Sequence, residues 1–247
     1  MQIVRYELLP VAGGLYYTVP SNIAGRTAPS MIISSGKAGN MGPSYDRCNE
    51  NRQKLYPRLG IAPEEVTGLR QEHTTSVLEA KRQADGGEYR ESGDGLISCD
   101  RGLALSVTVA DCLPVFLYHS SGVPFAVVHS GWKGTGIAAA AVEMMVSRYR
   151  VAPADLHAVI GPGIGSCCYR VDEERAALFR KRFGRNTVLS GPRLDLRQAN
   201  INVLCDAGVH NIAVSSECTA CTPWLGSYRR EGPEKFTRMI ALISFLL

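Results

Sequence analysis

The sequence predicts a mixed α/β fold in which an extensive β-sheet is covered by helices. Short apolar runs of strand length follow one another closely between residues 66 and 129. In the second half, three segments with helical periodicity alternate with strands. The 247 residues contain no internal repeat, low-complexity tract or Pro/Ser-rich linker, so we expect one continuous domain.

The N-terminal part predicts short strands and one helix. Gln2–Leu9 and Leu15–Val19 are typical of an opening β pair around a Gly-Gly turn, and Met31–Ser35 is typical of another strand ahead of a glycine-rich turn. Asp46–Leu55 is predicted to be a helix, because Pro57 follows it as a helix breaker.

The middle of the chain is predicted to be rich in strands. Apolar runs indicate strands at Val66–Gln71, Ser76–Ala80, Gly95–Cys99, Leu103–Val109, Leu113–Tyr118 and Phe125–His129. Residues 84–93, with the sequence ADGGEYRESG, predict a polar surface loop between two of these strands.

Three helices are predicted in the second half. Asp172–Phe183 begins with an N-cap aspartate and acidic residues and ends with basic residues, which suits the helix dipole. Thr135–Arg150 and Asp195–Ala207 carry apolar residues at helical spacing, and Gly208 ends the second of these helices. Strands are expected beside them at Ala158–Ile160, Ile212–Ser215 and Arg238–Phe245.

Charge and hydropathy exclude several classes of protein. The 27 basic and 23 acidic residues give a net charge of +4, and the basic residues are scattered, which falls short of a nucleic-acid-binding surface. The longest apolar run, Met239–Leu247, is about half as long as a transmembrane helix. The N-terminus lacks the pattern of an export signal, so we expect a cytoplasmic protein that binds neither nucleic acid nor membrane.

Three segments carry a side chain that could bind a metal ion. His73, Cys112 and His129 each lie at the end of an apolar run beside a turn, where a side chain projects rigidly into a cleft. Two imidazoles and one thiolate form a three-ligand zinc set that leaves a fourth position for water, as in catalytic zinc sites. Asp111 precedes Cys112 and would orient a ligating imidazole or transfer protons.

The same residues allow other interpretations. Cys112 and His129 could form the nucleophile and base of a metal-free cysteine hydrolase. A structural zinc module would instead use a fourth protein ligand and need no cleft. Taken alone, Cys112 is more typical of a small buried apolar residue.

Four further cysteines form two close pairs. Cys218-x-x-Cys221 could be a zinc half-site or a redox pair, but the sequence offers no second pair of this spacing for a four-cysteine site. Cys167 and Cys168 are adjacent on a predicted strand, so their side chains should point to opposite faces. We expect these four side chains to be packing thiols.

Five motifs, in order, resemble the laccase-domain family, whose members include polyphenol oxidases, purine nucleoside phosphorylases and peptidoglycan editing factors. The resemblance extends from residue 31 to residue 242, and the joint occurrence of the motifs is highly specific. The motifs are TVADCLPV at 108–115, VHSGWKGT at 128–135, IGPGIGSCCYRV at 160–171, LDL with Ala199-Asn200 at 194–200, and CTAC with SYRR at 218–230.

The resemblance implies a layered α/β/β/α sandwich with mixed sheets, formed by residues 1–247 as a single domain. It also implies a metal site at His73, Cys112 and His129 that holds Zn²⁺ or Cu²⁺. The implied activity is cleavage by phosphate of purine nucleosides such as adenosine, inosine and methylthioadenosine, with adenosine deamination as a side activity. Five histidines are too few for the centres of a multicopper oxidase. A single-copper polyphenol oxidase, or a Cys-His hydrolase acting on a peptidoglycan precursor, remains the alternative.

The expected substrates are a purine nucleoside and phosphate. Lys133, Arg229 and Arg230 are the expected cations, and Tyr228 is expected to contact the nucleoside. Cys112, His129 and Asp111 are the expected catalytic residues. In the deamination, a metal-bound hydroxide would attack purine C6 while Asp111 transfers protons. The sequence leaves open both the preferred nucleoside and whether the chain acts as a monomer or a homodimer.

Overall fold

Two mixed β-sheets pack face to face at the centre of the chain. The computed structural model describes residues 2–24, 27–43, 49–82 and 91–247. Val107 and Met239 from one sheet and Phe116 and Val127 from the other belong to one buried apolar cluster between the sheets. Burial of this apolar surface is the main driving force that holds the two sheets together.

Both sheets combine parallel and antiparallel strands. The seven-stranded sheet has the order β1 (Gln2–Tyr6), β14 (Asn211–Ser215), β11 (Leu156–Ile160), β9 (Leu113–His119), β10 (Phe125–Ser130), β7 (Gly95–Ser98) and β6 (Val77–Glu79). The six-stranded sheet has the order β2 (Leu9–Val11), β3 (Tyr16–Thr18), β4 (Ser30–Ser34), β15 (Met239–Ser244), β8 (Ala104–Val109) and β5 (Val66–Thr67). A separate hairpin joins β12 (Val188–Leu189) to β13 (Arg193–Leu194).

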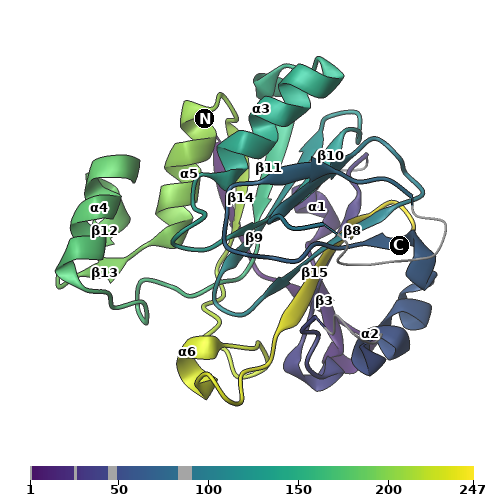
Figure 1. Cartoon of the computed structure of the whole chain (residues 1–247), viewed down its shortest axis with the longest axis horizontal. Coiled ribbons are helices and arrows are strands. Elements are labelled where there is room, and N and C mark those ends of the chain that lie inside the picture. Colours follow the sequence, from purple (N-terminus) through teal and green to yellow (C-terminus); the bar gives the residue numbers. More distant parts are fainter. Residues whose placement is uncertain (1, 25–26, 44–48, 83–90) are drawn as a thin grey trace.

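Helices cover the outer faces of the two sheets (Figure 1). The helices α3 (Ile137–Tyr149), α4 (Glu173–Phe183) and α5 (Leu196–Asp206) share a buried cluster with the seven-stranded sheet. On the other side, α2 (Glu50–Leu55) packs on the six-stranded sheet. None of the helices within the described ranges is both long and apolar enough to cross a bilayer. The layered α/β/β/α class with mixed sheets is therefore confirmed.

The helix ends follow the predicted capping residues closely. The carboxylates of Asp172 and Asp195 accept hydrogen bonds from the backbone N–H groups of Arg175 and Gln198, at 2.7 and 3.0 Å, so both aspartates are N-caps. The helix predicted at Asp46–Leu55 begins at Glu50 with Asn49 as its N-cap, and residues 46–48 lie outside the described part of the chain. Two helices of four residues, α1 (Ser21–Ala24) and α6 (Tyr228–Glu231), were not predicted.

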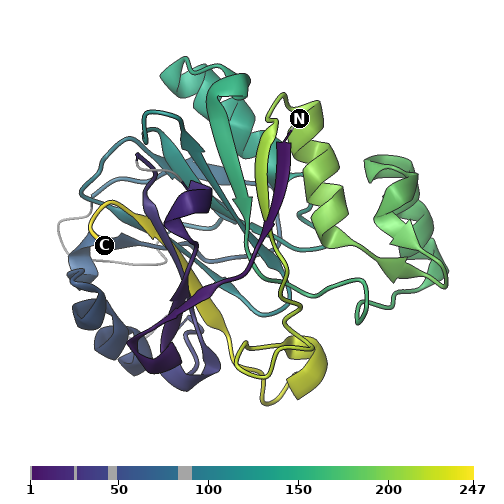
Figure 2. The ribbon, with the colours of Figure 1, turned by 180° about the vertical axis from the view of Figure 1, so that it is seen from behind.

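The predicted β pair around Gly13-Gly14 is present, but its first strand is Leu9–Val11 and not Gln2–Leu9. β1 ends at Tyr6 and pairs in parallel with β14 of the seven-stranded sheet, whereas β2 pairs with β3 of the other sheet. Figure 2 shows this N-terminal segment passing from one sheet to the other. The chain leaves the first sheet at Leu8, whose backbone N–H donates to Oε1 of Glu217 at 2.7 Å, a long-range contact that no local pattern reveals.

The strand predicted at Val66–Gln71 is shorter than expected. Regular pairing stops after Thr67, and Gln71 then bonds to the backbone of Thr108 through its side-chain amide. Its Oε1 accepts the Thr108 N–H at 2.7 Å and its Nε2 donates to the Thr108 carbonyl at 2.9 Å, which replaces strand pairing at this point. Most of the predicted loop, residues 84–90, lies outside the described ranges.

The buried side chain of Phe116 tests the packing between the sheets. It lies on β9 with 0% exposure. We expect Phe116→Ala to lower the free energy of unfolding by about 3–5 kcal/mol, because the substitution removes apolar contacts and leaves a cavity. Denaturant unfolding measures the change, with Leu189→Ala as a control because that side chain is 44% exposed. A loss below about 1 kcal/mol would contradict the assigned packing.

Candidate metal centre and the cavity beside it

The three predicted ligands lie together. The side-chain donor atoms of His73, Cys112 and His129 are all within 4.8 Å of one another. Cys112 lies in the turn between β8 and β9, His129 lies on β10, and His73 lies in the loop between β5 and β6. The two imidazole rings meet edge to face, with 4.8 Å between their centroids. Residues far apart in the sequence thus form one compact donor set.

The backbone is held in an uncommon conformation at two of these positions. His73 has a φ of 60° and Asp111, which precedes Cys112, has a φ of 82°. Side chains other than glycine rarely adopt this left-handed region. Such conformations concentrate at functional sites, where the surrounding structure holds them in place.

A buried carboxylate, Asp94, orients the His129 ring. Asp94 immediately precedes β7, which pairs with β10, and its side chain is fully buried. Its Oδ1 lies 2.8 Å from Nδ1 of His129, and its backbone carbonyl accepts the His129 N–H at 2.7 Å. When Nδ1 is the protonated nitrogen, Nε2 is left to bind a metal ion, as in carboxylate–histidine–zinc sites.

The same carboxylate also holds the loop that carries His73. The backbone N–H groups of Glu72, His73 and Thr74 donate to the two Asp94 oxygens at 3.2, 3.0 and 2.7 Å. The Thr74 hydroxyl donates to Oδ2 at 2.8 Å. One carboxylate therefore positions both imidazole ligands.

The electrostatics of the site favour a charged cysteine. Burial raises the pKa of the Cys112 thiol, but the charges and hydrogen bonds of His129 and His73 outweigh burial and lower that pKa to about 6. Burial lowers the pKa of His129, but Cys112 and Asp94 raise it to about 9. For Asp94, burial raises the pKa, and bonds from His129 and Thr74 outweigh burial and lower it to about 2. The thiolate is the form of cysteine that binds metals.

Glycine at position 131 leaves room for the donor set. A Cβ atom at Gly131 would lie 2.6 Å from the Cys112 sulfur and 3.4 Å from Cδ2 of His73. Any larger residue would therefore push these ligands apart. Two imidazoles and one thiolate suit zinc or copper, so the residues present fit a bound transition metal.

A cavity of about 460 Å³ opens beside the three ligands. This volume is within the usual range for small-molecule sites. Four aromatic side chains contribute to its wall, which are Trp132, Tyr169, Tyr228 and Phe236. The rings of Tyr228 and Phe236 meet edge to face at 5.0 Å between centroids. The cavity thus offers flat apolar surfaces next to the donor set.

Three arginines give the cavity wall positive charge. Arg175, Arg229 and Arg238 line it, and the Arg175 guanidinium lies over the Trp132 ring at 4.1 Å from the centroid. Of the predicted substrate-binding residues, Tyr228 and Arg229 therefore line the cavity.

The other two predicted cations, Lys133 and Arg230, lie outside the cavity wall. The Arg230 guanidinium is held by backbone carbonyls, including that of Thr219 at 2.6 Å, and by Glu231 at 2.6 Å. Lys133 is exposed, with Nζ 5.5 Å from the centroid of the Trp132 ring.

Asp111 lines the cavity and binds the backbone of Arg229, another lining residue. Its Oδ1 accepts the hydroxyls of Thr219 and Ser227 at 2.6 and 2.7 Å, and its Oδ2 accepts the backbone N–H of Arg229 at 2.6 Å. The carboxylate that contacts a ligand imidazole is Asp94, not Asp111.

Sequence reasoning missed Asp94, Arg175 and Arg238. Asp94 stands between two glycines and falls between the predicted loop at 84–93 and the predicted strand at Gly95–Cys99, so neither prediction includes it. A carboxylate flanked by glycines ahead of a fully apolar strand is the one signal that could have marked it. Arg175 lies in a helix with many charged residues, which gave no reason to single it out.

The family model described as multi-copper polyphenol oxidoreductase laccase matches residues 34–246. The chain belongs to this laccase-like family. All five histidines lie in the described ranges, and of these only His73 and His129 line the cavity. This member of the laccase-like family therefore has donors for one ion there rather than for a multicopper cluster.

Relatives of this laccase-like chain carry the name purine nucleoside phosphorylase. One from Deinococcus radiodurans is 37% identical over 199 residues, which cover 78% of this chain and 76% of the relative. Another, YlmD of Geobacillus stearothermophilus, is 31% identical over 210 residues, covering 78% and 77% of the two chains. The crystal structure of the Bacillus licheniformis hypothetical protein YfiH shares the fold, with a TM-score of 0.82 and 28% identity over 93% of this chain and 96% of that one.

The Asp94 carboxylate can be tested as the organiser of the metal centre. We expect Asp94→Asn to weaken zinc binding about 10- to 100-fold, because the substitution disturbs the carboxylate–histidine contact and the loop of His73. Competition with a chromogenic chelator measures the affinity. Asp206→Asn, an exposed change of the same chemistry, is the control. Equal affinity in both variants would refute the assigned role.

Gly131 offers a second test that leaves every ligand in place. Gly131→Ala should lower the zinc content of the purified protein, because its Cβ would contact the Cys112 sulfur. Gly136→Ala is the matched control, since its Cβ would meet nothing closer than 3.9 Å. Elemental analysis measures the zinc content of both variants. An unchanged zinc content in Gly131→Ala would show that His73, Cys112 and His129 do not bind one ion beside Gly131.

Proposed function

We propose that this protein cleaves purine nucleosides with phosphate in the cavity beside His73, Cys112 and His129. The observation that carries the proposal is the joint presence of a metal-type donor set, aromatic side chains and three arginines in one cavity. Relatives named purine nucleoside phosphorylase support the same reaction. Purine nucleosides such as adenosine, inosine and methylthioadenosine are the proposed substrates.

We assign the purine base to the aromatic part of the cavity wall. Tyr228 and Phe236 are in edge-to-face contact, and Tyr169 is among the same lining residues. A purine ring stacks well on such surfaces and loses apolar area to water when it binds. Tyr228 is 48% exposed, so its ring is accessible to an entering ligand.

We assign the phosphate to the arginines. A guanidinium presents paired N–H donors that match phosphate oxygens, and its charge is permanent. Arg229 is held in place through its backbone N–H by Asp111. We therefore assign Asp111 to positioning Arg229, because both of its oxygens already accept hydrogen bonds.

The proposed reaction exchanges one bond for another. A phosphate oxygen forms a bond to C1′ of the ribose, and the bond from C1′ to the purine nitrogen breaks. The electron pair of the broken bond stays with the purine, which takes up the proton given up by phosphate, and ribose 1-phosphate is the second product. A metal ion held by His73, Cys112 and His129 would supply Lewis acidity at this place.

A second candidate function uses the same residues without a metal. The lowered pKa of Cys112 and its contact with His129 also suit a cysteine nucleophile, as in a hydrolase or amidase acting on a peptidoglycan precursor. Asp94, His129 and Cys112 would then act as orienting acid, base and nucleophile. Adenosine deamination and single-copper polyphenol oxidation are further candidates, which ammonia release and oxygen consumption would identify.

The proposal is tested by incubating the metal-quantified protein with adenosine or inosine, with and without phosphate. We expect free purine and ribose 1-phosphate to form only when phosphate is present. Cys112→Ala should lose turnover and the metal ion held by His73, Cys112 and His129. Ribose without phosphate dependence would indicate a hydrolase. Full nucleoside cleavage by Cys112→Ala would contradict the proposal.

The role of Arg229 is tested by Arg229→Gln. We expect the KM for phosphate to rise about tenfold or more, because one charge-assisted contact to an anion contributes about 1.5–3 kcal/mol. The KM for the nucleoside should change much less. Steady-state kinetics measure both values, with Arg58→Gln, an exposed cation away from the cavity, as the control. An unchanged KM for phosphate would place the anion elsewhere.

A further inference from the structure

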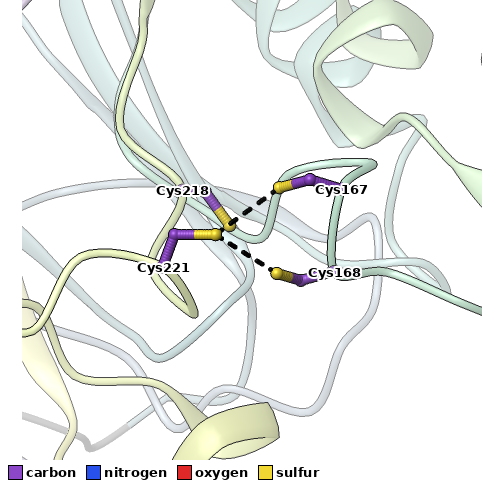
Figure 3. A group of neighbouring side chains, drawn as sticks. All are labelled: Cys167, Cys168, Cys218 and Cys221. Atoms are coloured by element: carbon purple, nitrogen blue, oxygen red, sulfur yellow. Dashed lines mark hydrogen bonds between the residues drawn. The ribbon is translucent and has the colours of Figure 1, made fainter.

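Four cysteines outside the described metal centre come together on one side of the molecule. Cys167 and Cys168 lie in the turn after β11, and Cys218 and Cys221 lie in the loop after β14. Figure 3 shows their side chains pointing toward one another from these two loops. We call this group the four-cysteine cluster. The expectation that Cys167 and Cys168 point to opposite faces of a strand was wrong, because they lie in a turn and both approach Cys221.

The sulfur positions match a tetrahedral metal shell. All four sulfur atoms lie within 4.8 Å of one another. The sulfur of Cys221 is 3.3 Å from that of Cys168 and 3.7 Å from that of Cys167. With zinc–sulfur bonds of about 2.3 Å, sulfurs at the corners of a tetrahedron are about 3.8 Å apart. The vicinal pair thus supplies the second half that Cys218-x-x-Cys221 lacked in the sequence.

A backbone N–H group points at one sulfur of the cluster. The Gly165 N–H donates to the sulfur of Cys218 at 3.1 Å. Backbone N–H groups directed at a ligand sulfur are the hydrogen bonds that support metal-bound thiolates.

A half-buried cation lies beside the same sulfurs. The Arg197 guanidinium interacts electrostatically with Cys218 and Cys167. It also donates to the carbonyl of Gly163 at 3.0 Å and to that of Glu217, so it contacts both loops. Four thiolates around a divalent ion carry a net charge of −2, which a neighbouring permanent cation offsets.

We propose that the four-cysteine cluster binds one Zn²⁺ ion in a closed, structural site. The site shares no residue with His73, Cys112 and His129 and does not depend on the proposed function. Four sulfur ligands leave no position for water, so the ion stabilises structure rather than reacting with a substrate. Binding releases the remaining thiol protons to solvent.

A disulfide is the main competing arrangement of these thiols. A disulfide bond has a length of about 2.05 Å, and all four cysteines are free thiols here. A single disulfide would also leave two thiols without a partner, whereas one ion uses all four. Tetrahedral four-sulfur sites are typical of zinc or iron, and the absence of an open position fits either metal. We choose zinc because the Cys-x-x-Cys turn with N–H groups on its first sulfur is typical of structural zinc sites.

The ion would connect one loop that lines the cavity to a second loop that contacts a lining residue. The Cys167–Cys168 loop continues to Tyr169, which lines the cavity. The other loop carries Thr219, whose hydroxyl donates to Asp111 and whose N–H donates to the Gly163 carbonyl. Zinc removal should therefore loosen the cavity wall without removing a ligand of the first metal centre.

The test uses the Cys112→Ala protein, in which the first centre has lost a ligand. Purified under reducing conditions and without strong chelators, this protein should hold one zinc ion per chain. X-ray absorption at the zinc edge should show sulfur neighbours alone, at about 2.3 Å. The added substitution Cys221→Ser should remove this zinc, whereas the added Cys99→Ser, an exposed cysteine outside the cluster, should keep it.

Several results would overturn the proposal. These are a Cys112→Ala protein with reduced thiols and no zinc, a zinc shell with nitrogen or oxygen neighbours, iron in place of zinc, or a disulfide between Cys168 and Cys221. In a chain that keeps Cys112, Cys221→Ser should lose the zinc of the four-cysteine cluster and keep the ion at the other centre. Because this readout is the metal count and its ligand shell, its failure is distinguishable from a failure of phosphorolysis.

Discussion

The Asp94 carboxylate is the contact on which the candidate site depends. It is buried between β7 and β10, where an unpaired charge would cost several kcal/mol. Three consecutive backbone N–H groups, one hydroxyl and one imidazole donate to it, so the charge is offset on every side. The Asp94 carboxylate thereby stabilises the loop in which His73 has a left-handed backbone conformation. It also orients the His129 ring, which interacts with Cys112.

Local patterns predicted the parts of the fold that local physics determines. The Asp172 N-cap and the central strands at residues 113–119 and 125–130 follow directly from capping and apolar runs. The first strand of the opening β pair was wrong because residues 2–6 pair with β14, more than 200 positions away. Such contacts between distant residues leave no trace in a short sequence window.

The candidate site also contains residues that the sequence predicted and residues that it could not predict. His73, Cys112 and His129 could be identified as a donor set from their positions beside turns and from the family resemblance. Asp94 could not, because its role consists of contacts to residues 72–74 and 129 that only the folded sheet brings near. The phosphate-binding cations were predicted because they lie in the family motifs. The Arg230 guanidinium instead donates to a backbone carbonyl of the loop that carries Thr219. The cavity uses Arg175 and Arg238, which other elements of the fold contribute.

The four-cysteine cluster and the candidate metal centre are both connected to the cavity. The cluster would fix the loops that carry Tyr169 and Thr219, and the candidate metal centre lines the cavity with Cys112 and His129. The chain would thus use one metal ion to stabilise the loops and another in the reaction. The strands of the fold already position these loops.

The most direct measurement of the central claim is a crystal structure with anomalous scattering recorded at the zinc and copper edges. The account predicts one peak bounded by the side chains of His73, Cys112 and His129, with Oδ1 of Asp94 still within hydrogen-bond distance of Nδ1 of His129. A reduced protein supplied with both metals that shows no peak there, with Cys112 hydrogen-bonded to His129 instead, would contradict it and favour the cysteine nucleophile.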